Sequence, residues 1–258
     1  MLRLGSIVEY EFGPNTGAIS LIYSHLLKKY DVDIDKDILV NHIGTELQEQ
    51  IVRHGNQLGI NIRWTLPGDF RKLDSFNKNL VFMEIINEAL LRLASERPQI
   101  DIIKIKAIRQ EILDKKFSFD IIYKSFVNKL REGQIAHVLV HPELEKFNYY
   151  LSIEEDKIEK CRVMIYSGKT TAFYIPDLFS YGKWKGVEEF IVTGKRSEIE
   201  IHICLEGCKV TFINMSGDSA KAPLFELFKS ETDEKKSLQD YLYSLNPALS
   251  AIITQSLN

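Results

Sequence analysis

The chain has 258 residues, of which 45% are hydrophobic and 27% are charged, and its formal net charge is −3. This composition is typical of a soluble globular protein with one or two domains and a core of its own. Neither half of the chain has a large excess of lysine and arginine. A dedicated nucleic-acid clamp is therefore not expected, because phosphate binding depends on basic side chains that release counterions.

The cysteines and the apolar runs bear on the compartment in which the protein works. An odd number of cysteines, 3 in a chain of this length, does not make a disulfide framework, so a reducing compartment fits best. The N-terminal sequence reaches Glu9 before any long apolar core, which makes it a poor signal peptide. No apolar run approaches the roughly 18 residues that a membrane helix needs. We therefore predict a cytoplasmic protein that does not enter a membrane.

Residues 1–116 are predicted to form a helix-rich α/β part. Apolar residues recur at helical spacing in several of its segments, and glycine or proline ends most of them. The expected helices cover residues 18–30, 35–54, 79–97 and 100–113, the last of which also alternates like a strand. The expected strands cover residues 4–12 and 59–66.

The pattern changes from Phe117 onward. Short segments rich in β-branched and aromatic residues follow at fairly regular intervals, and glycines or charged pairs separate them. Residues 117–216 are therefore predicted to form an antiparallel β-meander, and residues 217–258 a short helical C-terminal tail. Helices and strands that are segregated in this way define an α+β fold, either as one continuous domain or as two lobes.

The segment from Gly13 to Ser20 is placed like a phosphate-binding loop but lacks its chemistry. The loop pattern requires a lysine where this chain has Ile19, and an isoleucine cannot meet the β- and γ-phosphates. A turn that leads into a capped helix explains the segment instead. The later Gly168-Lys169-Thr170 lacks the first glycine of the same pattern and is assigned to a hairpin turn.

Metal binding has one weak candidate cluster, formed by His202, Cys204 and Cys208. On a strand, His202 and Cys204 share one face, and a turn at Glu206-Gly207 returns Cys208 to the neighbourhood. Cysteines on strands are usually buried small side chains, so we predict no metal and no cofactor.

Two other groups of residues are candidate binding sites. The segment 173–186 combines aromatic and cationic side chains, as protein contact sites do. Its candidate residues are Phe179, Tyr181, Lys183, Trp184 and Lys185. The alternative is that these aromatic side chains anchor a loop on the sheet. The second group is a polar patch on the helix predicted at 79–97, formed by Glu84, Asn87 and Glu88, for which a solvated face is the default interpretation.

The common catalytic motifs that we sought are not present, which favours a non-enzymatic intracellular binding protein. Such a protein acts through contact with a protein partner, as an adaptor or a toxin-neutralising immunity protein does, and nucleic acid is not the expected partner. The alternative is a hydrolase or nucleotide-handling enzyme whose site is assembled only in three dimensions, with Glu84, His42, His54 and His202 as contributors. A concave pocket with converging ionisable side chains would favour the enzyme, and a broad surface with outward aromatic residues would favour binding.

Overall fold

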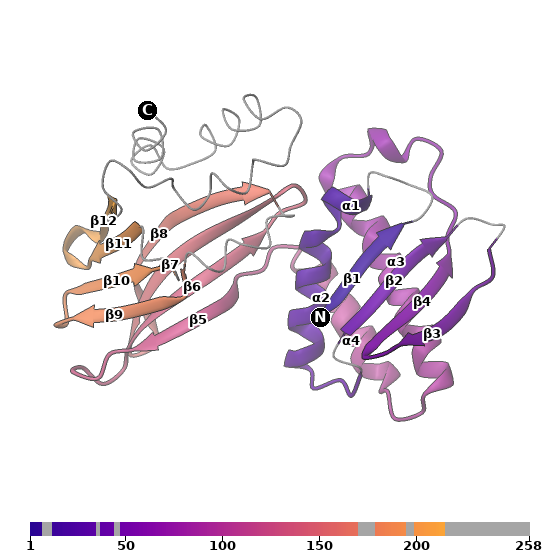
Figure 1. Cartoon of the computed structure of the whole chain (residues 1–258), viewed down its shortest axis with the longest axis horizontal. Helices are drawn as coiled ribbons and strands as arrows, with labels where there is room; N and C mark the ends of the chain where they lie inside the picture. Colours follow the sequence, from indigo (N-terminus) through magenta and orange to yellow (C-terminus); the bar gives the residue numbers. More distant parts are fainter. Residues whose placement is uncertain (7–11, 35–36, 44–46, 170–178, 195–198, 215–258) are drawn as a thin grey trace. The chain divides into compact units, whose positions relative to one another are not determined.

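A computed structural model describes the chain apart from residues 7–11, 35–36, 44–46, 170–178, 195–198 and 215–258. The chain divides into two compact units (Figure 1). Of the described residues, the first unit contains those in 1–121 and 142–146, and the second contains those in 122–141 and from Phe147 to Asn214. The helical tail predicted at residues 217–258 lies outside the described residues.

A four-stranded mixed sheet forms the centre of the first unit. Its strand order is β1-β2-β4-β3, in which β1, β2 and β4 are parallel and β3 is antiparallel to β4. The strands are β1 (Leu2–Ser6), β2 (Asp37–Ile43), β3 (Gln50–His54) and β4 (Gln57–Arg63). Alternate residues of β2 and β4 are buried, as expected of strands that are covered on one face.

The prediction of a helix-rich N-terminal part was wrong. The segment predicted as a helix at residues 35–54 contains strands β2 and β3 in the structure. Its apolar residues recur at roughly helical spacing, but Ile38, Val40 and His42 are buried and alternate with the period of a strand. The described residues therefore form a mixed α+β protein in which sheets, and not helices, organise both units.

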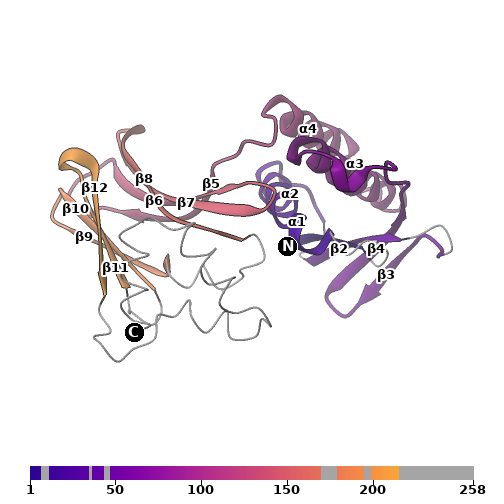
Figure 2. The ribbon, with the colours of Figure 1, turned by 90° about the horizontal axis from the view of Figure 1, so that it is seen from above.

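The helices of the first unit are α1 (Phe12–Asn15), α2 (Gly17–Lys29), α3 (Ser75–Glu96) and α4 (Ile102–Asp114), with a short 3-10 helix η1 (Phe70–Lys72) before α3. Figure 2 shows α2, α3 and α4 on the same side of the sheet. Side-chain caps begin two of these helices, because Asp74 accepts a hydrogen bond from the N–H of Asn77 and Asp101 accepts from the N–H of Ile103. The predicted helices at 18–30, 79–97 and 100–113 are confirmed, with ends that differ by a few residues.

The second unit contains two four-stranded sheets. The first has the order β5-β6-β7-β8, and the second has the order β12-β11-β10-β9 with antiparallel neighbours. The strands of the first sheet are β5 (Ile121–Val127), β6 (Gln134–Pro142), β7 (Lys146–Glu155) and β8 (Ile158–Lys169). Those of the second are β9 (Tyr181–Lys185), β10 (Glu189–Thr193), β11 (Ile199–Cys204) and β12 (Lys209–Asn214). The β-rich organisation predicted from residue 117 onward is confirmed in the described residues.

Side chains from the two sheets of the second unit meet between them. The Phe126 ring of β5 lies 5.4 Å from the Phe190 ring of β10. The indole N–H of Trp184 donates a 3.0 Å hydrogen bond to the carbonyl oxygen of Phe126. Glycine is required at position 182, because a Cβ atom on Gly182 would lie 2.5 Å from the Phe190 ring and 2.9 Å from that of Phe126. One side of β9 and β10 therefore packs against β5.

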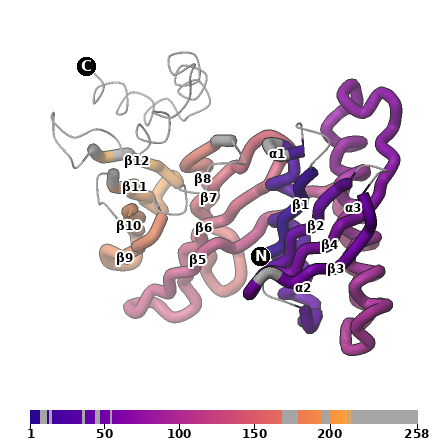
Figure 3. The backbone as a smooth tube through the Cα atoms, turned by 45° about the vertical axis from the view of Figure 1, so that its right-hand side comes forward, coloured from indigo at the N-terminus to yellow at the C-terminus, as the bar shows by residue number. Residues whose placement is uncertain are grey.

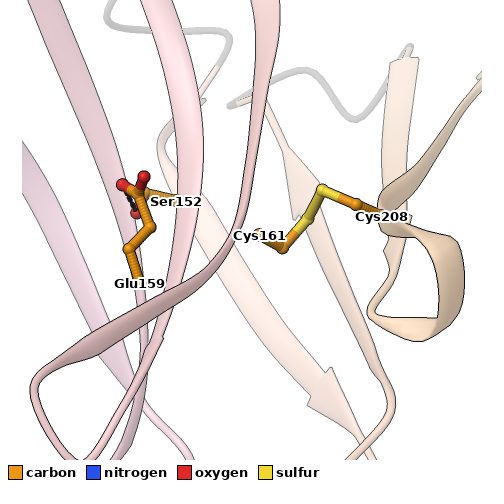
Figure 4. The surroundings of a disulfide bond; sticks show 4 residues. All are labelled: Ser152, Glu159, Cys161 and Cys208. Carbon is orange, nitrogen blue, oxygen red and sulfur yellow. Dashed lines mark hydrogen bonds between the residues drawn. A yellow bond between two sulfur atoms is a disulfide. The ribbon is translucent and has the colours of Figure 1, made fainter.

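A disulfide links the two sheets of the second unit. It joins Cys161 of β8 to Cys208 in the short helix η3 (Glu206–Cys208), and the two Cα atoms are 5.4 Å apart (Figure 4). The sequence analysis expected no disulfide framework, and the structure has a single disulfide, which was not predicted, with Cys204 as a free thiol. Within the described ranges, no helix is long and apolar enough to cross a membrane.

Candidate functional site

One face of the second sheet carries several of the side chains that the sequence analysis selected. Along β9, Gly182 and Trp184 face β5, so Tyr181, Lys183 and Lys185 point to the opposite side. Figure 3 traces β9 to β12 lying next to one another in chain order. We call the side away from β5 the outer face, and its residues on the first three strands are Tyr181, Lys183, Lys185, Glu189, Ile191, Thr193, Glu200, His202 and Cys204.

Five residues of the outer face form one continuous charged network. Glu189 lies between His202 and Lys185, with Oε1 2.7 Å from His202 Nδ1 and Oε2 3.1 Å from Lys185 Nζ. Glu200 lies between His202 and Lys183, with Oε2 2.9 Å from His202 Nε2 and Oε1 4.0 Å from Lys183 Nζ. The imidazole ring therefore stands at the centre, with a carboxylate on each side and a lysine beyond each carboxylate.

The strand register explains why these five side chains meet. Ile191 pairs with Lys183 on one neighbouring strand and with His202 on the other. Glu189 lies two residues before Ile191 and shares its face, and Glu200 lies two residues before His202 on β11. Opposite charges on adjacent strands stabilise such a face, whereas like charges directly opposite one another would destabilise it.

The position of the two carboxylates determines which protonation state of His202 the network fits. A neutral imidazole has one N–H, whereas both ring nitrogens are donors in the imidazolium form. Only the imidazolium can donate to Glu189 and Glu200 at the same time. The hydrogen bonds from His202 and Lys185 hold the pKa of Glu189 below its ordinary value, so this carboxyl group stays ionised.

The cationic groups of the network are its most exposed part. The side chains of Lys183 and Lys185 are 68% and 71% exposed. Those of Glu189, Glu200 and His202 are only 26%, 19% and 18% exposed. Solvent, or a partner, therefore meets ammonium groups first and finds the carboxylates already engaged beneath them.

Tyr181 extends the same line of exposed side chains. It is 59% exposed, and its strand partner Thr193 is in turn paired with Glu200. The other aromatic residues of the predicted 173–186 site have different positions. Phe179 is buried, with its ring 5.2 Å from that of Tyr149, and Trp184 packs 5.1 Å from Phe190 on the inner side. The remaining positions from 173 to 178 lie outside the described residues.

The structure does not bring His202, Cys204 and Cys208 together as metal ligands. Both ring nitrogens of His202 face carboxylates, and Cys208 is bonded to Cys161. Across the described part of the chain, no group of three or more histidine, cysteine, aspartate or glutamate side chains is arranged to hold a metal ion.

The polar patch on α3 does not form a site either. Glu84 is held by Arg109 of α4, whose Nε lies 3.1 Å from both carboxylate oxygens. Asn87 is buried, whereas Glu88 on the same helix is exposed. These three side chains therefore have separate environments and separate contacts.

The residues proposed for an enzyme are not shown to meet in one site. His42 is buried on β2, with Nδ1 2.9 Å from Ser6 Oγ and Nε2 3.0 Å from the carbonyl oxygen of Trp64. His202 belongs to the second unit, and the side chain of His54 lies outside the described residues. A cavity of about 410 Å³ is present in the first unit, and most of its lining is apolar: Met1, Leu2, Ser24, Leu27, Lys28, Asp31, Val32, Ile34 and Ile38. Neither His42 nor Glu84 lines this cavity.

The segment that resembles a phosphate loop has a structural role. Ile19 is fully buried in α2, and Ser20 Oγ accepts a 3.1 Å hydrogen bond from the N–H of Leu4. Thr16 Oγ1 donates a 2.8 Å hydrogen bond to the carbonyl oxygen of Leu4. Strand β1 is an edge strand, so these hydroxyl groups satisfy backbone groups that have no neighbouring strand.

The sequence analysis missed Glu189 and Glu200, which connect the residues that it did select. Glu200 lies in the alternating segment Ile199–Cys204, so its face could have been inferred, whereas Glu189 precedes the continuous apolar run Phe190, Ile191 and Val192, which does not indicate a face. Comparison of the chain with protein-family models, with curated proteins and with solved structures gave no match.

Proposed function

We propose that this chain is a non-enzymatic binding protein that docks a protein partner on the outer face of the β9–β12 sheet. The observation that carries the proposal is the line of exposed side chains on β9, namely Tyr181, Lys183 and Lys185. A tyrosine next to flexible cationic side chains offers both a large contact area and hydrogen-bond donors, and tyrosine is enriched in protein interfaces.

The arrangement of this face favours binding over chemistry. Its backbone is held in three hydrogen-bonded strands, so little backbone freedom would be lost when a partner docks. Its cationic side chains, Lys183 and Lys185, are 68% and 71% exposed, whereas most small-molecule sites bury the greater part of their ligand. The ionisable residues that an enzyme would need have separate partners, as described above. A role as an adaptor or as an immunity-type protein that covers a toxin fits this geometry.

The cytoplasmic location stays a prediction, and the disulfide of the second unit is evidence against it. Disulfides persist in oxidising compartments and are rare in the cytosol, where they are usually transient. The Cys161–Cys208 bond therefore favours either an oxidising compartment or a bond that forms reversibly.

Site-specific photocrosslinking in the native host tests the docking face. A photoreactive amino acid replaces Tyr181 in one variant and Ile158 of β8 in the control, since both side chains are 59% exposed and both lie in the second unit. We expect position 181 to crosslink to one discrete protein and position 158 not to do so. Loss of that product when Lys183→Glu and Lys185→Glu are added would support the face. Equal products from both positions, or none from position 181, would refute the proposal.

A further inference from the structure

We infer that the partner presents an acidic segment to Lys183 and Lys185, and that the proton on His202 controls how strongly this segment binds. This inference rests on the proposed function, because it names the partner chemistry and the regulation of the same face. It is carried by the order of contacts in the charged network and by the difference in exposure between its lysines and its carboxylates.

The outer face offers hydrogen-bond donors but few free acceptors. Each of the four carboxylate oxygens of Glu189 and Glu200 already faces His202 or a lysine. The ammonium groups of Lys183 and Lys185 each carry three N–H donors, and only one direction is used by the network. The complementary surface must therefore supply acceptors, and carboxylates are the acceptors that pair best with exposed lysines.

The charge of the network depends on His202. With an imidazolium at its centre, the network holds three positive and two negative groups and is cationic. When the imidazole is neutral, the positive and negative charges balance. One carboxylate then faces a nitrogen lone pair across 2.7 or 2.9 Å and is repelled by it. That carboxylate turns more fully to its lysine, which competes with the partner.

The direction of the pH effect follows from these contacts. Histidine is the side chain that ordinarily changes its charge between about pH 5 and pH 8. Loss of the His202 proton removes one positive charge and strengthens the internal pairing of the lysines. Binding of an acidic segment is therefore expected to weaken as the pH rises through this range.

Other groups near His202 do not reverse this direction. The ionisable groups on the same face are Tyr181, Lys183 and Lys185 from β9, Glu189 from β10, Glu200 and Cys204 from β11, and Lys209 from β12, and none of them gains positive charge as the pH rises. The residue of β12 directly opposite His202 is Thr211, which does not titrate.

The favoured occupant is an acidic protein segment and not nucleic acid. A nucleic-acid site needs several basic side chains that track a phosphate backbone. On this face, Lys183 and Lys185 lie next to each other on β9 and Lys209 lies on β12, whereas Glu189 and Glu200 lie on the two strands between β9 and β12. Such alternation suits discrete carboxylates on a protein surface better than a continuous row of phosphates.

Binding of a fluorescent dodecaglutamate peptide to the full chain tests the inference at low salt, near pH 6 and near pH 8. By fluorescence anisotropy we expect binding about threefold tighter near pH 6, the size expected for one unit charge in water. The Lys183→Gln/Lys185→Gln variant should bind about tenfold more weakly, since two charge-assisted contacts are lost. The His202→Gln variant should bind with the same affinity at both pH values.

Matched variants serve as controls. The Lys157→Gln/Lys160→Gln variant removes the same charge from two exposed lysines at the β7–β8 hairpin and should bind the peptide as the natural chain does. The His137→Gln variant removes another histidine of the second unit and should keep the pH dependence. Circular dichroism of each variant identifies any loss of fold.

Specific outcomes would overturn the inference. Equal weakening by the Lys157/Lys160 control would show that net charge, and not this face, binds the peptide. A natural chain with equal affinity at both pH values would remove the role of the His202 proton. Tighter binding of a DNA duplex of equal charge would replace the acidic protein with nucleic acid. If the peptide fails to bind while position 181 still crosslinks to a protein, the inference fails and the docking function stands.

Discussion

Replacement of Trp184 by alanine tests whether this side chain supports the fold or takes part in docking. The indole ring contacts Phe190, and its N–H donates a 3.0 Å hydrogen bond to the carbonyl oxygen of Phe126. Truncation of a fully buried tryptophan costs about 3–5 kcal/mol, and the half-buried position reduces the packing loss to about 2 kcal/mol. The carbonyl oxygen of Phe126, which is left without its hydrogen-bond donor, adds about 1 kcal/mol to this loss of stability. Trp184→Ala should therefore lower the free energy of unfolding by about 3 kcal/mol.

Two further variants separate these contributions. Trp184→Phe keeps an aromatic ring but removes the donor, so it should cost about 1 kcal/mol. Lys183→Ala changes the adjacent residue on the outer face and should stay within about 0.5 kcal/mol of the natural chain. Urea unfolding followed by far-UV circular dichroism measures all three. A Trp184→Ala protein as stable as the natural chain would refute the packing argument and return Trp184 to the candidate binding residues.

Two predictions concern other parts of the molecule. Burial raises the pKa of Glu111, but hydrogen bonds from Lys29, Tyr30 and Lys115 outweigh it and lower that pKa to about 2. Because the folded-state pKa of Glu111 lies below the ordinary 4.5, its ionised carboxylate stabilises the folded chain above pH 4.5, and this stabilisation is lost as the pH falls toward 2. Glu111→Gln should therefore lower the free energy of unfolding by about 1–2 kcal/mol near neutral pH and by less in acid. Urea unfolding measures both values, and an equal loss in acid and near neutral pH would contradict this prediction. The Cys161→Ser/Cys208→Ser variant, which removes a link across 47 residues, should lower the free energy of unfolding by about 3–4 kcal/mol. Alkylation of all three cysteines in the unreduced natural chain would show that the disulfide does not form.

Local pattern predicted some parts of the fold better than others. The long helix α3 carries a regular apolar stripe, and the strands after residue 117 alternate clearly, so both could be predicted. Residues 35–54 failed because helical spacing was given more weight than the strict alternation of Ile38, Val40 and His42. A two-residue connection at Gly55-Asn56 joins β3 to β4, and Gly55 has a φ of 57°. A glycine and an asparagine between two apolar runs are typical of a hairpin turn, whereas Gly55 was interpreted only as the end of a helix.

Three of the five charged residues of the network, and Tyr181, could be selected from the sequence, but the site could not be predicted as a unit. Tyr181, Lys183 and Lys185 were selected for composition, and His202 was selected as a metal ligand. Their meeting depends on the registers of the β9–β10 and β10–β11 pairs, which a one-residue slip would change completely. The same is true of the disulfide, because cysteine pairing is a property of the folded chain and not of spacing.

Segment 173–186 shows why exposure could not be predicted there. A loop was expected to display all of its aromatic residues or to tuck in all of them. Strand β9 instead sends successive side chains to opposite faces, so Trp184 packs against Phe190 on the inner side while Lys183 and Lys185 face outward.

A lysine-labelling footprint on the complex with the partner captured at position 181 tests the docking face most directly. An amine-reactive reagent modifies exposed lysines, and mass spectrometry compares the modification of each residue with and without the partner. We expect the partner to protect Lys183 and Lys185 strongly and to leave Lys157 and Lys160 unchanged. Unchanged labelling of Lys183 and Lys185 in a saturated complex would contradict the account, because the partner would then bind elsewhere.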